Sequence, residues 1–406
     1  MPPPDRGNSA GPGDAGDNIP PPSSNDDCGQ AEKDIIDQKE LRRCGRGIRR
    51  LVTLCGTVTQ LVAEYDRRLL RPESDNNNTN GDDGNSDEDD EDIPPEKREE
   101  VRSRRDRDYQ SYLELAKLVL ALKVRITNPH QEARMLYYAR LLDCANNARS
   151  DDTARVKPNI ANLLNNRANN PASPPLDLET RDTRGLQNNF TGRLICPIKY
   201  DWEDPVVRAK IRDCVDGHNA SDDYWLRCLY EGEKGDPEDV EKGFLKSALL
   251  VKTFQMIFTS PSSARGNLDA EPVPERRERR KKAPSKCPPV AEQLRMDGQV
   301  TTRSIAYVAV QLHFALCDAT HWMNHYNGFN YEEFYEFIID FFEADQTPEG
   351  KAASTELLNW WNIQVFPRSA ATRAALSISA RQSSLTVLRE QRRARLSRIP
   401  SWLLSK

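Results

Sequence analysis

Four side chains that can bind soft metals recur at every fourth position near the C-terminal end: His313, Cys317, His321 and His325. In a helix, a step of four residues completes one turn and adds about 40°, so neighbours in this set share a face and can approach one zinc ion. A structural zinc site needs four ligands in a tetrahedron, which one helix rarely supplies, and the segment HWMNH lacks the glutamate of the HExxH motif. The spacing therefore favours packed or solvent-facing histidines, and we predict neither a bound metal nor a cofactor.

Other arrangements that could support chemistry are weaker. Cys196, Cys214, His218 and Cys228 form a second group, but it contains no CxxC pair and its spacing is irregular. The sequence has no GxSxG motif for a nucleophilic serine. The string CGRGIRR, residues 44–50, has two glycines but neither a preceding strand nor a third glycine, so it is not a phosphate-binding loop. We therefore predict no catalytic residue.

The string LICPIKYDWEDP, residues 194–205, combines a cysteine before proline with two aromatic residues and an acidic turn. Proline disfavours helix at the residue before it, and residues 194–198 are the one segment that resembles a short strand. Trp202 is expected to be a packed ring, and Asp204 with Pro205 is expected to cap and begin the next helix. The string is therefore predicted to be a structural turn.

The segments that must position these residues are predicted to be helices. Apolar side chains between positions 44 and 69 alternate in steps of four and three, which gives the repeat of about 3.5 residues that is typical of a narrow helical seam. We predict that residues 34–70 pair with a second seam at 107–126 as an antiparallel hairpin, joined by the acidic segment 72–105 as a disordered loop. The first seam consists of Cys44, Ile48, Leu51, Cys55, Val58, Val62, Tyr65 and Leu69.

The C-terminal half contains a segment, residues 300–322, that is apolar on nearly all sides of a helix. Such a helix is normally central, and the amphipathic segments 331–343 and 355–366 are expected to pack against it. The predicted fold is therefore mainly α, with an N-terminal helical hairpin, a C-terminal all-helical domain, and long disordered tails and insertions.

Composition divides the chain into folded and unfolded segments. Only 37% of the residues are hydrophobic while 30% are charged and 27 are proline, so several segments cannot bury enough apolar surface to fold. The predicted map is a disordered tail at 1–33, the hairpin region at 34–149 with its acidic insertion at 72–105, an Asn/Pro-rich linker at 150–184, a helical domain at 185–366 with a disordered basic insertion at 262–298, and a basic tail at 367–406.

Several strings in the C-terminal half carry a resemblance to a known family. GRLICPIKYDW, DPEDVEKGFLKSALLVKTFQMIFTSPSSA, RSIAYVAVQLHFAL, FNYEEFYEFIIDFFE and LLNWWNIQVF occur in this order. They resemble a domain-of-unknown-function family that is abundant in mushroom-forming (basidiomycete) fungi. The resemblance covers residues 185–366, with residues 146–149 belonging to it. It implies a domain-sized folded unit and no catalytic residue.

The sequence also bears on location. Nine irregularly spaced cysteines are not a disulfide scaffold, and the N-terminus, MPPPDRGNSAGPGDAGD, lacks the basic and apolar regions of a secretory signal. No run reaches the ~18 apolar residues that a membrane-spanning helix requires. We therefore expect an intracellular protein with reduced thiols and no membrane association, located in the nucleus or the cytoplasm.

Two main classes of function fit these patterns. A non-enzymatic interaction or scaffold protein fits the seam at 44–69, which could bind a protein partner or a second copy. The alternative is a nuclear nucleic-acid-associated protein that contacts phosphates through its basic segments, and an unrecognised enzyme is a weaker alternative. The residues proposed for nuclear localisation or nucleic-acid binding are Arg276, Arg277, Arg279, Arg280, Lys281 and Lys282.

Overall fold

The computed structural model describes residues 24–70, 94–120, 131–221, 223–259 and 288–369, with a few single positions beyond these ranges. The chain divides into two compact units, Met1–Leu41 and Arg42–Lys406. The first unit contributes the start of one helix, and the second contains every other described element. The described part is mainly helical and has almost no strand, which confirms the predicted fold class.

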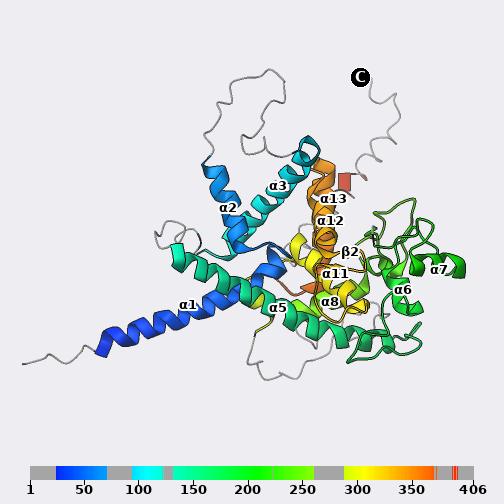
Figure 1. Cartoon of the computed structure of the whole chain (residues 1–406), viewed down its shortest axis with the longest axis horizontal. Helices are drawn as coiled ribbons and strands as arrows, with labels where there is room; N and C mark the ends of the chain where they lie inside the picture. Colours follow the sequence, from blue (N-terminus) through cyan, green and yellow to red (C-terminus); the bar gives the residue numbers. More distant parts are fainter. Residues whose placement is uncertain are drawn as a thin grey trace, which may run out of the picture. The chain divides into compact units, whose positions relative to one another are not determined.

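Figure 1 labels most of the helices along the chain. The only sheet in the described ranges is a two-stranded antiparallel hairpin, in which Tyr326 pairs with Phe329. None of the described helices is long and apolar enough to span a bilayer. The elements are α1 (Ser24–Leu51), α2 (Val58–Leu69), α3 (Pro95–Leu118), α5 (Gln131–Asn165), α6 (Asn189–Ile195), α7 (Pro205–Asp213), the 3-10 turns η2 (Arg227–Leu229) and η3 (Glu231–Glu233), α8 (Ala248–Phe258), α10 (Val290–Gln293), α11 (Thr302–Leu316), β1 (His325–Tyr326), β2 (Phe329–Asn330), α12 (Tyr331–Glu343) and α13 (Pro348–Val365).

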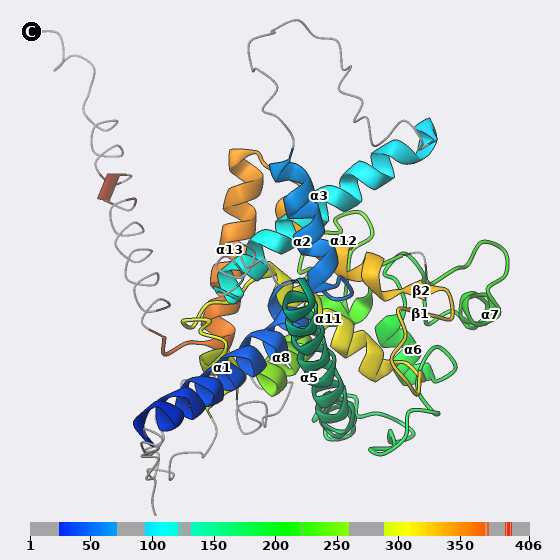
Figure 2. The same ribbon diagram turned by 60° about the vertical axis from the view of Figure 1, so that its left-hand side comes forward.

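Helix α11 is the centre of the main hydrophobic core. It contacts α5, α8 and α12, and Ile305, Val308 and Leu312 are fully buried. The Thr301 hydroxyl accepts a hydrogen bond from the Ser304 N–H, and the Ser304 hydroxyl accepts one from the Thr301 N–H, which together form a capping box at the start of α11. Figure 2 shows α5, α8 and α12 around α11. The prediction that this helix is central is confirmed.

The seam at 44–69 does not form one helix. The chain breaks between α1 and α2, where Val52 and Leu54 are buried and the Thr57 hydroxyl accepts a hydrogen bond from the Gln60 N–H to start α2. The N-cap at Thr57 thus starts a new helix, although the apolar repeat of the sequence continues across the break. On both sides of the break the seam lies in the core of this same chain, since Cys44, Ile48, Val58 and Val62 are all buried.

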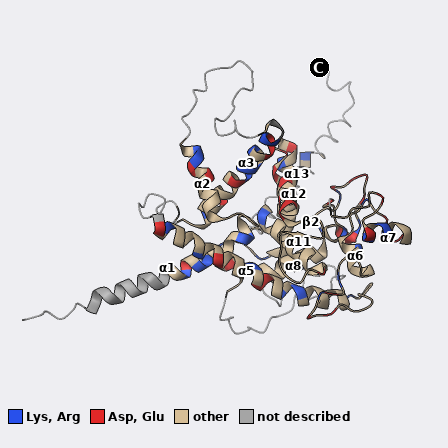
Figure 3. Cartoon of the chain, in the orientation of Figure 1, with Lys and Arg blue, Asp and Glu red and all other residues tan. Residues whose placement is uncertain are grey.

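Helix α2 packs against α3, which gives the predicted hairpin a shorter first arm. The Tyr65 and Tyr112 rings stack with centroids 4.1 Å apart. In Figure 3, Lys and Arg alternate with Asp and Glu along α3, whereas α11 carries few charges. Helix α3 begins at Pro95, so the predicted disordered insertion at 72–105 was wrong for residues 95–105; residues 71–93 lie outside the described part.

The predicted linker at 150–184 was wrong over its first half. Helix α5 continues through Pro158 to Asn165, because fully buried side chains recur at every fourth residue and offset the poor helix propensity of its asparagines. These are Ala148, Asp152, Val156, Ile160 and Leu164. Two smaller boundaries also differ: α1 includes residues 24–33 of the predicted tail, and α10 lies within residues 288–298 of the predicted basic insertion.

The predicted strand at 194–198 was also wrong. Residues up to Ile195 belong to α6, and Pro197 makes an isolated bridge with Leu226. A Cβ atom on Gly192 would lie 2.4 Å from Cζ2 of Trp202, so glycine is required for the ring to pack on α6. The remaining features of this turn agree with the prediction: Trp202 is buried, and the Asp204 carboxylate accepts a hydrogen bond from the Val206 N–H at the start of α7.

Candidate functional site

The four side chains that could bind a soft metal, His313, Cys317, His321 and His325, do not lie on one helix. Helix α11 ends at Leu316, so His313 and Cys317 lie in the core while His321 and His325 are exposed in the following loop and in β1. In the described ranges, no three His, Cys, Asp or Glu side chains are grouped in a way that could hold a metal. The assumption that one helix carries all four residues was wrong.

His313 and Cys317 meet at a tyrosine. Nδ1 of His313 lies 3.1 Å from the Tyr331 hydroxyl, and Sγ of Cys317 lies 3.3 Å from the same oxygen. The His313 ring stacks on Phe329 with centroids 3.9 Å apart. Burial lowers the pKa of His313 to about 3 and raises the pKa of the Cys317 thiol. At neutral pH the cluster is therefore uncharged, and the thiol is not activated as a nucleophile.

A cavity of about 390 Å³ opens beside this cluster. His313 and Cys317 form one wall, and Arg212, Asp318 and Tyr326 supply polar groups from α7, the end of α11 and β1. The cavity is within the size range of small-molecule sites. Its polar groups can orient a ligand, but the cluster supplies neither a thiolate nor a charged imidazole for catalysis at neutral pH.

The second cysteine group is dispersed. Cys196 is buried next to Trp202, and Cys228 is buried in the main core. Cys214 ends α7 in the left-handed conformation and is exposed, while the His218 ring stacks on Tyr200. Burial raises the pKa of Cys196 to about 11. These residues therefore serve packing and helix termination.

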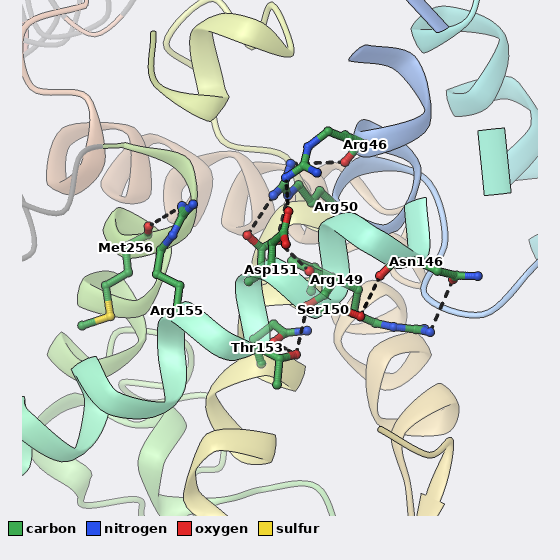
Figure 4. A network of polar contacts seen from close by, with 12 residues as sticks. Arg46, Arg50, Asn146, Arg149, Ser150, Asp151, Thr153, Arg155 and Met256 are labelled. Atoms are coloured by element: carbon green, nitrogen blue, oxygen red, sulfur yellow. Dashed lines mark hydrogen bonds and ion pairs between the residues drawn. The ribbon is translucent and has the colours of Figure 1, made fainter. Parts of the chain in front are cut away.

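A polar network joins α1 to α5 (Figure 4). At its buried end, Arg50 donates two hydrogen bonds of 2.8 Å to the two carboxylate oxygens of Asp152, and the Tyr307 hydroxyl donates a third to the same carboxylate. At its exposed end, Arg46 pairs with Asp151 at 2.8 Å. The sequence did carry a sign of the buried pair, because Asp152 is the one acid among the buried residues at every fourth position of α5.

A second cleft was not predicted from the sequence. It has a volume of about 750 Å³ and lies between the end of α8, α10 and the end of α13. Its apolar lining includes Phe258, Val365 and Phe366, from helices more than a hundred residues apart. No local motif could indicate it, because the cleft exists only once α8 and α13 have packed together.

The predicted basic site, Arg276, Arg277, Arg279, Arg280, Lys281 and Lys282, lies outside the described residues.

The fold and the site define a mainly helical protein in which His313 and Cys317 are buried and uncharged and the buried Arg50 is ion-paired with Asp152. A family model described as a family of unknown function (DUF6698) matches residues 143–366. Because the match spans more than half of the chain, the protein belongs to this family. The match begins inside α5 and so includes Asn146 and Asp152. The search of curated proteins gave no match, and neither did the search of solved structures.

Proposed function

We propose that this protein is a non-enzymatic interaction protein that binds an extended segment of a partner protein in the 750 Å³ cleft between α8, α10 and α13. The seam at 44–69 was the predicted partner surface, but Cys44, Ile48, Val58 and Val62 of this seam are buried in the chain's own core. The cleft offers an apolar surface that is large enough for several side chains of a bound peptide.

The observation that carries this proposal is an unsatisfied acceptor at the cleft. The Gln255 side chain lines the cleft and donates through Nε2 to the Gln364 carbonyl at 3.2 Å, while its Oε1 is buried without a hydrogen-bond partner among the described residues. Buried acceptors are normally satisfied, and a rotation of the Gln255 side chain toward the cleft would let Oε1 accept a hydrogen bond from the backbone N–H of an extended peptide. Exposed charges on the rim, from Glu292, Arg295 and Arg368, can select the partner.

The proposal is tested by photo-crosslinking in the full chain. A crosslinking residue at position 295, on the rim, is expected to capture a partner protein in cells, and Gln255→Ala is expected to reduce this product at least several-fold. The matched control position is Val206, which is 61% exposed on α7 and does not line the cleft. Crosslinks only to other parts of the same chain, or the same products from position 206, would contradict the proposal.

We also propose that the protein enters the nucleus through the basic run at 276–282. The support is from sequence alone: the run RRERRKK lies in a proline-containing segment and can be bound by an import receptor as an extended chain. A fluorescent fusion is expected to be nuclear and to move to the cytoplasm when Arg279, Arg280, Lys281 and Lys282 are changed to alanine. A wild-type fusion confined to the cytoplasm would refute this location.

The nucleic-acid alternative depends on the same segments, and a duplex DNA titration at two salt concentrations tests it.

A further inference from the structure

A small cationic pocket lies between α5 and the C-terminal end of α11. Its volume is about 280 Å³, and the basic side chains at its wall are Arg149, Lys157, Arg181 and His321. None of the residues that line it is an aspartate or a glutamate. Several positive groups thus converge on one cavity without a lining carboxylate.

The two arginines are held in place by aromatic rings and neutral oxygens. The Arg149 guanidinium lies 4.5 Å from the centroid of the Trp322 ring, and Arg149 donates to the side-chain oxygen of Asn146 (Figure 4). The Arg181 guanidinium lies 4.3 Å from the Phe314 ring and donates at 3.0 Å to the carbonyls of Phe314 and Thr320. These contacts fix both guanidiniums before any ligand arrives.

Neither guanidinium has a counter-charge within hydrogen-bonding distance. In the described ranges, Arg149 and Arg181 form no ion pair, and every acceptor that they contact is neutral. Burial lowers the pKa of both arginines, which reflects the cost of desolvating them. A further arginine, Arg49, lies nearby, and its pKa is lowered to about 10 by burial and by the charge of Arg149. Asp318 influences Arg181 only weakly and lines the neighbouring 390 Å³ cavity instead.

We propose that this pocket binds a phosphate-type oxyanion. Guanidinium groups match the oxygens of phosphate with paired N–H donors. Lys157, whose ammonium also donates to the Glu179 carbonyl, adds a further cationic group at the wall. The Trp322 ring also lines the pocket, and its buried Nε1–H has no hydrogen-bond partner among the described residues. The volume is below the 300 Å³ or so at which drug-sized sites begin, so a single phosphate group with few attached atoms fits best.

Calorimetry on the full chain tests this inference with two ligands, inorganic phosphate and O-phosphoserine. Saturable binding of one anion per chain is expected, and the Lys157→Gln/His321→Gln double variant is expected to weaken it at least tenfold. Lys242→Gln, at an exposed lysine that does not line the pocket, should leave the affinity unchanged. Tighter binding of O-phosphoserine would identify a phosphorylated side chain as the source of the group, and tighter binding of inorganic phosphate would identify the free anion.

Arg149→Gln should abolish binding, but it also removes the contact with Trp322, so its melting temperature must be compared with that of the wild type. If Arg149→Gln does not fold, the Lys157→Gln/His321→Gln double variant, whose positions are half-exposed and exposed, still tests whether the anion binds in this pocket. Absence of saturable binding at millimolar anion would overturn the proposal. Equal affinity in the wild type and the double variant would do the same, because the anion would then bind elsewhere.

Discussion

Replacing Asp152 with asparagine is expected to lower the free energy of unfolding by about 3–5 kcal/mol, because it leaves the buried charge of Arg50 without a partner. The two side chains are 0% and 2% exposed, and they share two hydrogen bonds of 2.8 Å. The same change also weakens the hydrogen bond that the Tyr307 hydroxyl donates from α11. Urea unfolding of the full chain, followed by circular dichroism, measures the loss.

The adjacent residue provides a matched control. Asp151 pairs with Arg46 at the same 2.8 Å, but these side chains are 55% and 28% exposed, so Asp151→Asn should change stability by less than about 1 kcal/mol. The double variant Arg50→Met/Asp152→Leu should recover part of the loss, since it removes both buried charges together but leaves the Tyr307 hydroxyl without its acceptor. Equal effects at positions 151 and 152 would show that burial does not determine the importance of this pair.

The buried pair also shows how helices outside the family region are attached to it. Arg50 lies in α1, before the matched residues, whereas Asp152 and Tyr307 lie within them. A Cβ atom on Gly45 would lie 2.6 Å from Cβ of Cys144 and 2.8 Å from the Leu141 carbonyl oxygen. Gly45 therefore allows α1 to approach α5 closely, whereas a Cβ atom on Gly47 would lie 2.9 Å from Cδ2 of Leu118 at the end of α3. Close packing thus explains both glycines of CGRGIRR in a helix.

The elements that sequence periodicity predicted well are those whose burial is local and strongly patterned. Helix α11 is apolar on nearly all sides, and α12 has opposed apolar and acidic faces. The sequence therefore predicted that α11 is central and that α12 packs against it. For the second half of α5, the asparagines and Pro158 suggested a linker from residue 150. The helix continues because the tertiary burial of Val156, Ile160 and Leu164 outweighs the low helix propensity of this segment.

The sites were harder to predict because each is assembled from distant segments. The cationic pocket combines α5 with the loop before α6 and the end of α11, and no local spacing relates Arg149 to Arg181. The proximity of His313 and Tyr331 likewise depends on the hairpin β1–β2, which turns the chain back onto α11. Spacing alone indicates which side chains share a helix face, but it does not indicate where that helix ends.

Acidification is expected to destabilise the wild-type protein more than a variant that lacks the His313 imidazole. Burial lowers the pKa of His313 from 6.5 to about 3, so the folded state keeps the ring neutral while the unfolded state protonates it below pH 6.5. The unfolded state then binds more protons, and stability falls as the pH falls from about 6.5 towards 3. The contribution of this group between pH 7 and pH 4 is about 3 kcal/mol.

His313→Phe is the informative variant. Phenylalanine can keep the stack on Phe329, the neighbouring 390 Å³ cavity can accommodate its extra atoms, and the Tyr331 hydroxyl keeps Cys317 as a partner. Urea unfolding at pH 7 and pH 4 should show that the variant loses about 3 kcal/mol less than the wild type, while carboxylates that titrate in the same range affect both proteins equally. His313→Gln supplies a second comparison that keeps a polar group beside Tyr331. Identical pH dependence in all three proteins would mean that the imidazole is protonated in the folded state, and the cluster would then be a charged site rather than a neutral one.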